Sequence, residues 1–597
     1  MRSAFLSPFR FYLVFAAITC VFCSLAGRLV YLQVVKGDAL RDSARNARQN
    51  FSVLLARRGD IVDAKGNLFA TTRSLVEVGV DPQAVQDEDL PKVSKLAELL
   101  QVSEVEILKA FSNKTRPGNE FSGEVRPIRW TKIADDVEED VYRRLMELEI
   151  QGVYGNFKHS RLYPGNKLAS HVIGFVNKDG IPSMGVEKTV DYYLRGQAGW
   201  REWERDGRRR ELLQYRTREV PSEDGLNVEL SIDRMIQDMV ERELASVVEE
   251  YHPISASIIV SEPSTGYVLA MANVPDFDPN KFNNYEMGNL RNRTITDVYE
   301  PGSVFKIVAA GGAMNENLVT GDSIIDCSTS ITMRGSRKYR LPRDDHPLGK
   351  ISVEEVVVHS SNRGAAQLGI MLGASRFYEY CKSFGFGART GIGFRGERRG
   401  TLHHPKRWDG LTITRMPMGH AVSVTPMQMH SAMSAVASNG ILMKPQVVRR
   451  VYDSEGKTVV EFKPRSIRRV LRTEVAKNLT GMLAKVVSEG TAKRAKIKGY
   501  LVAGKTGTTK KIIDGQYSNR HHVASFVGFL PANDPRIVIS VIVDEPKMKP
   551  GRIGYGSSVA GPAFQRVAKE VIGYLGIRPN QTDEELATML SGRARAL

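Results

Sequence analysis

The stretch "YEPGSVFKIV", residues 299–308, places a serine directly after a Pro-Gly turn and a lysine three residues later, among apolar neighbours. We expect the turn to start a helix, so the i to i+3 spacing puts Ser303 and Lys306 on one helix face. A serine hydroxyl is a weak nucleophile unless a base accepts its proton, and a buried lysine amine can serve as that base. Alone, however, the S-x-x-K pattern often arises by chance and also fits an exposed helix lysine.

Two further motifs follow in a fixed order. "VVVHSSNRGAAQLG", residues 356–369, carries S-x-N at the start of another helical pattern, and "LVAGKTGTT", residues 501–509, carries K-T-G at the end of an apolar strand. S-x-x-K, S-x-N and K-T-G on helix, loop and strand form the motif set of penicillin-binding proteins and β-lactamases. The three motifs together are strong evidence for a serine acyl-enzyme chemistry.

At this point the sequence closely resembles the class B penicillin-binding proteins, which are monofunctional peptidoglycan D,D-transpeptidases. The resemblance covers nearly the whole chain and includes "RRGDIVDAKGNLFATT" (57–72), "RLYPGNKLASHVIGFV" (161–176), "GVEKTVDYYLRGQAG" (185–199), "STGYVLAMANVPDFDPN" (264–280), "GHAVSVTPMQ" (419–428) and "EGTAKRAKIKGYLVAGKTGT" (489–508). "YEPGS" is more similar to the cell-division (septal) members than to the elongation type. "YGSSVAGPAF" (555–564) departs from the usual pattern, which affects only the expected local packing.

The resemblance implies roles for the first two motifs. Ser303 would be the acylated nucleophile and Lys306 its base. Ser360 and Asn362 would relay protons and hold the substrate amide, with Ser361 as the variable middle residue.

It also implies roles for the third motif. Lys505 would supply positive charge, and Thr506 and Thr508 would bind the carboxylate of substrate or antibiotic. Gly507 fits the need for a close backbone approach beside the pocket. The backbone N–H groups of Ser303 and Thr508 would form the oxyanion hole.

The N-terminus predicts a membrane anchor. After Arg2 and Arg10 comes the uncharged "FYLVFAAITCVFCSLAG" (11–27), and the apolar pattern continues beyond Arg28 to residue 35. Such a run is long enough to span a bilayer, and the N-terminal arginines favour an N-in orientation. A signal peptide cleaved after Ser24-Leu25-Ala26 is the alternative, but the apolar stretch extends well past that site, so we favour a retained anchor.

The rest of the chain predicts an α+β protein with two extramembrane domains. We assign residues 1–10 to a cytoplasmic tail, 11–35 to the anchor, 36–225 to an elongated, β-rich pedestal resembling a dimerisation domain, 226–576 to the transpeptidase domain and 577–597 to a C-terminal tail with a short helix. In the pedestal, strand-like runs are "LVEVGVD" (75–81) and "HVIGFV" (171–176), and helical runs are "KVSKLAELL" (92–100) and "EEDVYRRLMELEI" (138–150). Residues 200–220 mix charges around Asp206-Gly207, as in a solvated hairpin or loop.

The transpeptidase domain should be an antiparallel sheet packed against helices. A helix capped by Asp233 should bury one face, made of Met235, Ile236, Met239, Val240 and Leu244. Residues 255–275 predict two strands with a turn at 263–266, and residues 522–546 two more with a turn at 531–535. The final helix, 559–575, should bury Phe564, Val567, Ala568, Val571 and Leu575.

Composition limits the other possibilities. The chain of 597 residues is 42% hydrophobic and 25% charged, as in folded globular proteins, and its net charge of +17 favours an anionic partner. No nucleic-acid-binding motif is present, which leaves a membrane surface or a phosphorylated substrate. The four cysteines cannot form a disulfide framework, and whether Cys327 and Cys381 meet cannot be read from the sequence.

The histidines do not follow a metal-binding pattern, so we expect no metal and no cofactor. His359 lies beside Ser360, His403-His404 and His521-His522 are pairs, and His420 matches a family position where we expect a structural role.

The leading hypothesis is a serine-type D-Ala-D-Ala transpeptidase in the bacterial inner membrane, with its catalytic domain outside, that cross-links stem peptides at the septum and is acylated by β-lactams. The resemblance also implies contacts of anchor and pedestal with a lipid-linked-precursor glycan polymerase and other division proteins. Two alternatives stay open: a D,D-carboxypeptidase or β-lactamase that uses water as acceptor, and a catalytically silent division scaffold or β-lactam sensor. No E-x-x-L-N of the class A β-lactamase type lies between the second and third motifs.

Overall fold

The computed structural model describes residues 8–117, 125–205, 211–548 and 553–580. They form two compact units. The first unit comprises the described residues up to Arg57 together with Gly196–Gly225. The second unit comprises Arg58–Arg195 and the described residues from Leu226 onward. Each unit is described by itself below.

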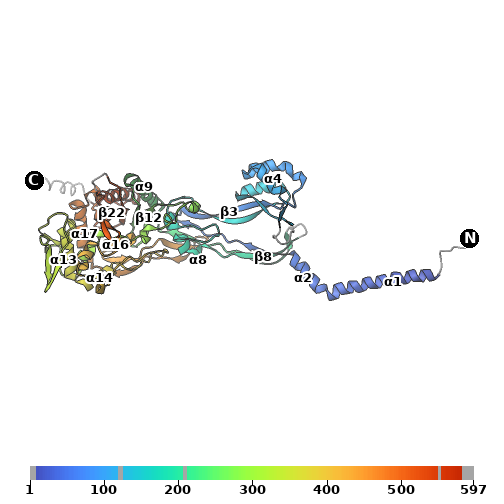
Figure 1. Cartoon of the computed structure of the whole chain (residues 1–597), viewed down its shortest axis with the longest axis horizontal. Coiled ribbons are helices and arrows are strands. Elements are labelled where there is room, and N and C mark those ends of the chain that lie inside the picture. The colour runs from blue at the N-terminus through green and yellow to red at the C-terminus, as the bar shows by residue number, and fades with distance from the viewer. Residues whose placement is uncertain (1–7, 118–124, 206–210, 549–552, 581–597) are drawn as a thin grey trace. The chain divides into compact units, whose positions relative to one another are not determined.

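The first unit contains the expected apolar helix. Helix α1 (Pro8–Val30) continues through a π-helical turn, η1 (Tyr31–Val35), and α2 (Gly37–Arg48) follows (Figure 1). Within the span Pro8–Val35, an 18-residue stretch has a mean hydropathy of 2.1 and no buried residue, so the span is long and apolar enough to cross a membrane. Residues 1–7 of the expected tail lie outside the described residues.

The same unit holds a three-stranded antiparallel sheet in the order β1-β8-β9, with bounds β1 (Gln49–Leu54), β8 (Gly199–Arg205) and β9 (Glu211–Val220). The pairing of β8 with β9 is the antiparallel pair expected for residues 200–220. The turn at Asp206-Gly207 lies outside the described residues.

In the second unit, a seven-stranded sheet joins distant parts of the chain. Its order is β19-β18-β10-β2-β3-β6, and β7 also pairs with β3. The strands are β2 (Ile61–Val62), β3 (Leu68–Val80), β6 (Thr131–Glu138), β7 (Val153–Leu162), β10 (Asn227–Leu230), β18 (Val448–Tyr452) and β19 (Thr458–Glu461). Because β10 pairs with both β2 and β18, segments far apart in sequence share one sheet.

Helices cover this sheet and confirm part of the sequence reading. They are η2 (Asp87–Lys92), α3 (Val93–Leu100), α4 (Glu104–Ser112), α5 (Glu139–Met146), α6 (Ser170–Ile173), α7 (Gly185–Thr189) and α8 (Asp191–Leu194), beside a small pair β4 (Thr115–Pro117) and β5 (Val125–Pro127). The helices expected at 92–100 and 138–150 are present as α3 and α5, and the strand at 75–81 is part of β3. The strand expected at 171–176 is wrong, because residues 171–173 belong to the single helical turn α6, which is capped by Gly174 with φ +79°.

A buried ion cluster ties this region together. The Glu187 side chain is fully buried and accepts hydrogen bonds at 2.7 Å from both Arg58 Nε and Arg161 Nε. Arg58 also reaches Asp191 Oδ1 at 2.6 Å. The cluster is held by segments separated by over a hundred residues, so it fixes tertiary rather than local structure.

The expected antiparallel sheet forms the centre of the region that carries the three sequence motifs, and its strand order is β12-β11-β23-β22-β21. Its strands are β11 (Ser255–Ser261), β12 (Val268–Val274), β21 (Ala503–Ile513), β22 (Gln516–Leu530) and β23 (Ile537–Asp544). Both predicted strand pairs, 255–275 and 522–546, are confirmed. Strand β21, which carries K-T-G, is an edge strand.

Helices α9 (Arg234–Tyr251) and α18 (Ala560–Leu575) pack on one face of this sheet. Asp233 caps α9 as predicted, accepting hydrogen bonds from the N–H groups of Met235 and Ile236. Most of the predicted apolar faces are buried, but Met239 is only partly buried, and two residues at helix ends are exposed: Met235 at 47% and Leu575 at 41%.

Helix α16 (Pro426–Ala437) covers the opposite face. Its buried His430 lies 2.6 Å from Ser261 Oγ and 2.7 Å from Ser540 Oγ, whereas Phe564 of α18 packs on Phe526, which pairs with Val541. Neighbouring strand residues such as Ser540 and Val541 point to opposite faces, so α16 and α18 lie on opposite faces of the sheet.

The remaining elements lie around α16 and the sheet edge. They are η3 (Pro279–Asn284), α10 (Arg293–Thr296), η4 (Gly302–Phe305), α11 (Lys306–Asn315), β13 (Ile324–Asp326), β14 (Ile331–Arg334), β15 (Arg337–Arg340), β16 (Lys350–Ser352), α12 (Val353–Val358), α13 (Asn362–Leu372), α14 (Ala374–Ser383), η5 (Pro405–Arg407), α15 (Thr412–Arg415), η6 (Met416–Met418), β17 (Ile441–Met443), β20 (Ser466–Arg469), α17 (Thr473–Ser488) and η7 (Lys493–Ala495).

Candidate active site

The turn that carries Ser303 is held tightly by its neighbours. Ser303 lies in the 3₁₀ turn η4 and α11 begins at Lys306, as the Pro-Gly pattern predicted. Gly302 has φ +57°, and a Cβ atom there would lie 2.4 Å from Thr509 Oγ1. Val304 and Phe305 are fully buried. The serine therefore sits on a rigid support at a point where only glycine fits before it.

Lys306 is buried at the junction of the first two motifs, with 2% exposure. Its Nζ donates hydrogen bonds to the Ser360 backbone oxygen and to Asn362 Oδ1 (2.8 Å), and it lies 3.1 Å from Ser360 Oγ. Burial lowers the pKa of Lys306 well below its ordinary value, and the nearby Lys505 lowers it further. A neutral amine can donate to the first two acceptors and receive a proton from the Ser360 hydroxyl.

The second motif is shaped by an unusual backbone conformation. Ser360 has φ +59°, in the left-handed region that non-glycine residues rarely adopt. Ser361, 1% exposed, caps α13 by accepting from the Gly364 N–H at 3.0 Å, which turns its neighbours toward Lys306. Asn362 Nδ2 donates to the Arg343 backbone oxygen at 2.9 Å, so both ends of its amide are fixed.

The third motif lies against the turn that carries Ser303. A Cβ atom at Gly507 would lie 2.9 Å from the Pro301 oxygen and 3.0 Å from Val304 Cγ2, so the missing side chain allows β21 to pack flush with η4. Thr508 Oγ1 accepts a hydrogen bond from the Gly556 N–H at 3.0 Å. Thr506 Oγ1 lies 3.2 Å from Thr491 Oγ1.

Lys505 is the least satisfied charged group of the site. Its side chain is fully buried, and its Nζ has no hydrogen-bond partner within the described part of the chain. Burial alone lowers the pKa of Lys505 to about 7. A buried cation without a partner is unfavourable, so the site is poised to receive a negative group.

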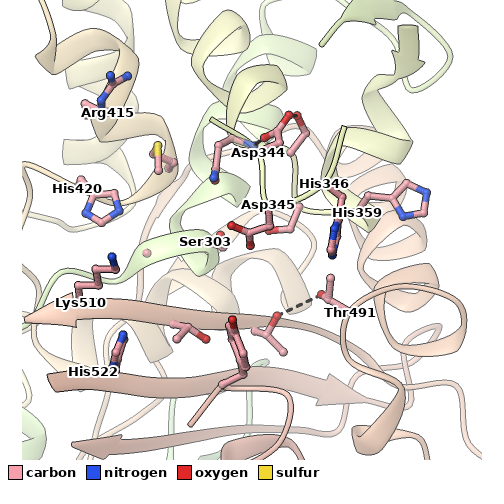
Figure 2. Close-up of a pocket in the computed structure, with 18 of the residues that line it drawn as sticks. Ser303, Asp344, Asp345, His346, His359, Arg415, His420, Thr491, Lys510 and His522 are labelled. Carbon is pink, nitrogen blue, oxygen red and sulfur yellow. Dashed lines mark hydrogen bonds between the residues drawn. The ribbon is translucent and has the colours of Figure 1, made fainter. Parts of the chain in front are cut away.

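The three motifs meet at a cavity of about 1000 Å³. Ser303, Ser360, Asn362, Thr506 and Thr508 all line it, while Lys306 and Lys505 lie behind its wall. Figure 2 shows Ser303 near the middle, with His420, Lys510 and His522 at one end and His346, His359 and Thr491 at the other. A hydroxyl, a buried amine with a lowered pKa and fixed donors around an open space can perform acyl transfer.

Comparison with known proteins agrees with this geometry. The family model described as "Penicillin binding protein transpeptidase domain" matches residues 256–569, which is more than half of the chain. The chain belongs to this family.

A second model, the penicillin-binding protein dimerisation domain, matches residues 53–230 of this penicillin-binding protein. The two domains in this order are those of the class B proteins, as the motifs predicted. The chain is 33% identical over 580 residues to stage V sporulation protein D of Bacillus subtilis, covering 96% of this chain and 87% of the relative. It is 29% identical over 581 residues to the peptidoglycan D,D-transpeptidase FtsI of Escherichia coli, with coverages of 96% and 92%. The similarity to FtsI is consistent with the septal type.

Solved structures share the fold. Penicillin-binding protein 2X from Streptococcus thermophilus has a TM-score of 0.72 at 22% identity, covering 88% of this chain and 80% of that one. Penicillin-binding protein 3 from Mycobacterium tuberculosis, complexed with aztreonam, has a TM-score of 0.67 at 24% identity, with coverages of 89% and 98%. At these identities the likeness concerns the fold alone.

Several residues of this penicillin-binding protein were missed by motif reasoning. Asp344 accepts hydrogen bonds from Ser361 Oγ (2.9 Å) and from the N–H groups of Asn362 and Arg363, so it holds the start of α13. Thr491 positions Thr506. The acidic pair in "RDDH" was the only sequence signal for Asp344, and a lone threonine gave none for Thr491.

The histidines have mixed roles. His420, expected to be structural, lines the cavity and lies 2.7 Å from Glu300 Oε2 through its Nδ1 atom. His359 and His522 line the cavity as well. Among the described residues, no group of three or more His, Cys, Asp and Glu side chains is arranged to hold a metal ion.

The two buried cysteines do not pair. Cys327 and Cys381 are both free thiols. Cys327 Sγ lies 3.4 Å from Ser361 Oγ, so it packs under the second motif, and burial raises its pKa, which keeps the thiol protonated.

Proposed function

We propose that this chain is a membrane-anchored serine D,D-transpeptidase that cross-links peptidoglycan stem peptides at the division septum and is acylated there by β-lactams. One observation carries the proposal: residues of all three motifs, although far apart in sequence, border one cavity, and Lys306 is buried against Ser360 beside it. The names of the relatives agree with it, since FtsI is called a peptidoglycan D,D-transpeptidase.

Acylation would begin at Ser303. Its Oγ attacks the carbonyl carbon between the two D-Ala residues of a stem peptide, while neutral Lys306 accepts the hydroxyl proton. The C–N bond then breaks, and the proton passes through Lys306 and Ser360 to the amine of the leaving D-Ala. The lowered pKa of Lys306 supports this role, because only a neutral amine can accept a proton.

The third motif would hold the charges of the substrate. The backbone N–H groups of Ser303 and Thr508 would stabilise the oxyanion. Thr506 and Thr508 would bind the terminal carboxylate, with Lys505 behind them. A bound carboxylate satisfies the unpartnered Lys505 ammonium and raises its pKa from about 7, so binding and charge reinforce each other.

Deacylation would complete the cross-link. An amine from a neighbouring strand attacks the ester carbon, the bond to Ser303 Oγ breaks, and the serine recovers its proton through Lys306. Asn362, which is fixed by Lys306 and Arg343, would orient the substrate amide throughout.

The location and partners follow from the same proposal. Residues 11–35 would span the inner membrane with residues 1–10 in the cytoplasm, residues 36–225 would form the pedestal, and residues 226–576 would act in the periplasm. The anchor and pedestal would contact a glycan polymerase and other division proteins. The uninterrupted apolar helix supports the anchor.

Mass spectrometry after penicillin treatment tests the assignment. We expect one adduct, on Ser303, that Ser303→Ala abolishes. An adduct elsewhere, or none in the wild type, would contradict the proposal. Rapid turnover of a chromogenic cephalosporin would favour the hydrolase, and complementation of a depletion strain by Ser303→Ala would favour the scaffold.

A further inference from the structure

A second cavity, of about 450 Å³, lies at the end of the same sheet. Its floor includes Ser255, Val523, Asp544 and Thr509, which face one another across four neighbouring strands. Asp544 lies four residues after Ser540 on β23 and therefore on the sheet face covered by α16. Lys505, four residues before Thr509 on β21, lies on this face too, so the cavity begins about 13 Å along the strand from Lys505.

The roof of this cavity is the segment that leads to the nucleophile. Tyr299 and Glu300 line it, and Tyr299 is fixed by hydrogen bonds with Val424 in both directions, at 3.0 and 2.9 Å. The close fit of Gly302 over Thr509 Oγ1 continues this roof up to Ser303. A ligand in the cavity would therefore lie directly beneath the turn that presents Ser303.

A thin wall separates the second cavity from the active one. Glu300 faces the second cavity, but its carboxylate lies 2.7 Å from His420 Nδ1 and accepts from the Tyr517 hydroxyl at 3.1 Å; both partners line the active cavity. Lys510 lines both cavities. Figure 2 shows Lys510 beside His420 at that end of the active cavity.

The carboxylates around the second cavity are already partnered. Asp297 accepts from Arg293 Nη1 at 2.9 Å and also pairs with Arg291. Asp544 Oδ2 accepts from Lys511 Nζ at 3.1 Å, and its Oδ1 lies 3.0 Å from the same ammonium but is buried without a hydrogen-bond partner among the described residues. With Glu300 held as above, each of these three carboxylates has a cationic or hydrogen-bonding neighbour.

Two lining cations have no carboxylate partner. Within the described part of the chain, no carboxylate lies within 4.0 Å of Arg398 or Lys510, and Lys510 donates only to the neutral Asn519. The Tyr299 hydroxyl and Arg293 Nε are buried without a hydrogen-bond partner among the residues that the structure describes. Leaving such donors unsatisfied is unfavourable, so the cavity offers free donors and positive charge to an anion.

We propose that this second cavity binds the free carboxylate of a second wall peptide, held beside the acyl-enzyme. The inference rests on the proposed function, because transpeptidation requires two peptides at one site. Guanidinium, ammonium and hydroxyl donors are the groups that bind carboxylates in proteins, and 450 Å³ is enough for a peptide end. The first peptide occupies the active cavity, so the second peptide would bind in the second cavity.

The test measures peptide binding when the active cavity is blocked. The full-length protein in detergent is acylated with a penicillin, and the adduct on Ser303 is confirmed by mass spectrometry. Diacetyl-Lys-D-Ala-D-Ala and its C-terminal amide are then titrated by calorimetry. We expect the acid to bind about tenfold more tightly than the amide, the ratio that about 1.4 kcal/mol from one charge-assisted contact gives.

Variants locate the binding. Arg398→Ala should weaken binding of the acid about tenfold and leave the amide unchanged. Arg395→Ala is the matched control, because Arg395 is an exposed arginine of the same loop that does not line the cavity, and it should have no effect. Ser257→Val, which adds bulk to the buried floor, should reduce binding of the acid while acylation of Ser303 keeps its wild-type rate.

The failures are distinguishable. Equal affinity for acid and amide, or an unchanged affinity in Arg398→Ala, would refute the second site while a normal adduct on Ser303 leaves the proposed function intact. Displacement of the peptide by an equal concentration of acetate would show that the cavity takes any small carboxylate, which refutes the peptide assignment. Absence of the adduct would refute the proposed function itself.

Discussion

A negative charge introduced at position 362 tests whether Lys306 is the base. Asn362 Oδ1 lies 2.8 Å from Lys306 Nζ. In Asn362→Asp, a carboxylate would take this place and favour the ammonium form of Lys306, in opposition to the burial that now lowers its pKa. Acylation requires the neutral amine, so the rate should rise with pH through the pKa of Lys306, and the substitution should move that rise to higher pH.

The geometry sets the size of this shift. Two unit charges about 2.8 Å apart interact by about 6 kcal/mol at an effective dielectric constant of about 20, which corresponds to an upper limit of about four pKa units. Asn362 lines an open cavity, so solvent screens the new charge, and the carboxylate also faces the Arg343 oxygen without the amide donor. We therefore expect a shift of about two units, and an acylation rate near neutral pH that is lower by about tenfold for each unit that the pKa of Lys306 lies above the assay pH.

The assay is the second-order rate of acylation by a fluorescent penicillin between pH 5 and 10, with thermal unfolding as a check on the fold. Asn362→Ala is the matched control, because it removes the hydrogen-bond acceptor of Lys306 without adding charge. Its acylation rate should fall, and the pH at which that rate rises should move lower or stay unchanged. If the profile of Asn362→Asp keeps the wild-type midpoint while the protein remains folded, Lys306 is not the base.

Three further predictions concern stability and positioning. Gly302→Ala should cost about 1–2 kcal/mol of unfolding free energy and slow acylation, because φ is +57° and the new Cβ would lie 2.4 Å from Thr509 Oγ1; if Thr509→Ala in the same chain restores nothing, the clash is not the cause. Glu187→Ala should destabilise the protein by about 3–5 kcal/mol in chemical denaturation, since it leaves the buried Arg161 guanidinium without a carboxylate and Arg58 with Asp191 alone, whereas Asp238→Ala, at an exposed ion pair, should cost less than about 1 kcal/mol. Burial lowers the pKa of His430 from 6.5 to about 3, so the unfolded state binds the proton first and stability should fall below pH 6.5 by up to about 1.4 kcal/mol per pH unit; a His430→Gln variant with an equally steep slope would assign the loss to other groups.

Local sequence signals predicted much of this fold. The Pro-Gly turn, the Asp233 cap and the apolar strands of residues 255–275 and 522–546 all act within a few residues of one another, so their effects can be read from spacing. The same reasoning failed where nearly every side chain is buried. The run at 171–176 is apolar apart from His171, and its periodicity could not distinguish a strand from the helical turn α6.

Helix ends were the other source of error. Met235 and Leu575 follow the apolar periodicity of their helices but are half-exposed, at the first turn of α9 and the last turn of α18. How far a partner surface extends depends on packing and is not encoded in the helix itself.

The sequence by itself determined which groups are available for chemistry: Ser303 and Lys306 on one helix start, Ser360 and Asn362 at another, and Lys505 to Thr508 on a strand. These are short-range facts, fixed by spacing and backbone preference. Only the tertiary structure decided how the groups meet. The fold directs the hydrogen bonds of Lys306 to Ser360 and Asn362 and brings Asp344 to the start of α13. It also buries Lys505 without a hydrogen-bond partner in the described part of the chain. The pKa of each lysine depends on burial and on charges from distant segments, and these arise only when the chain has folded.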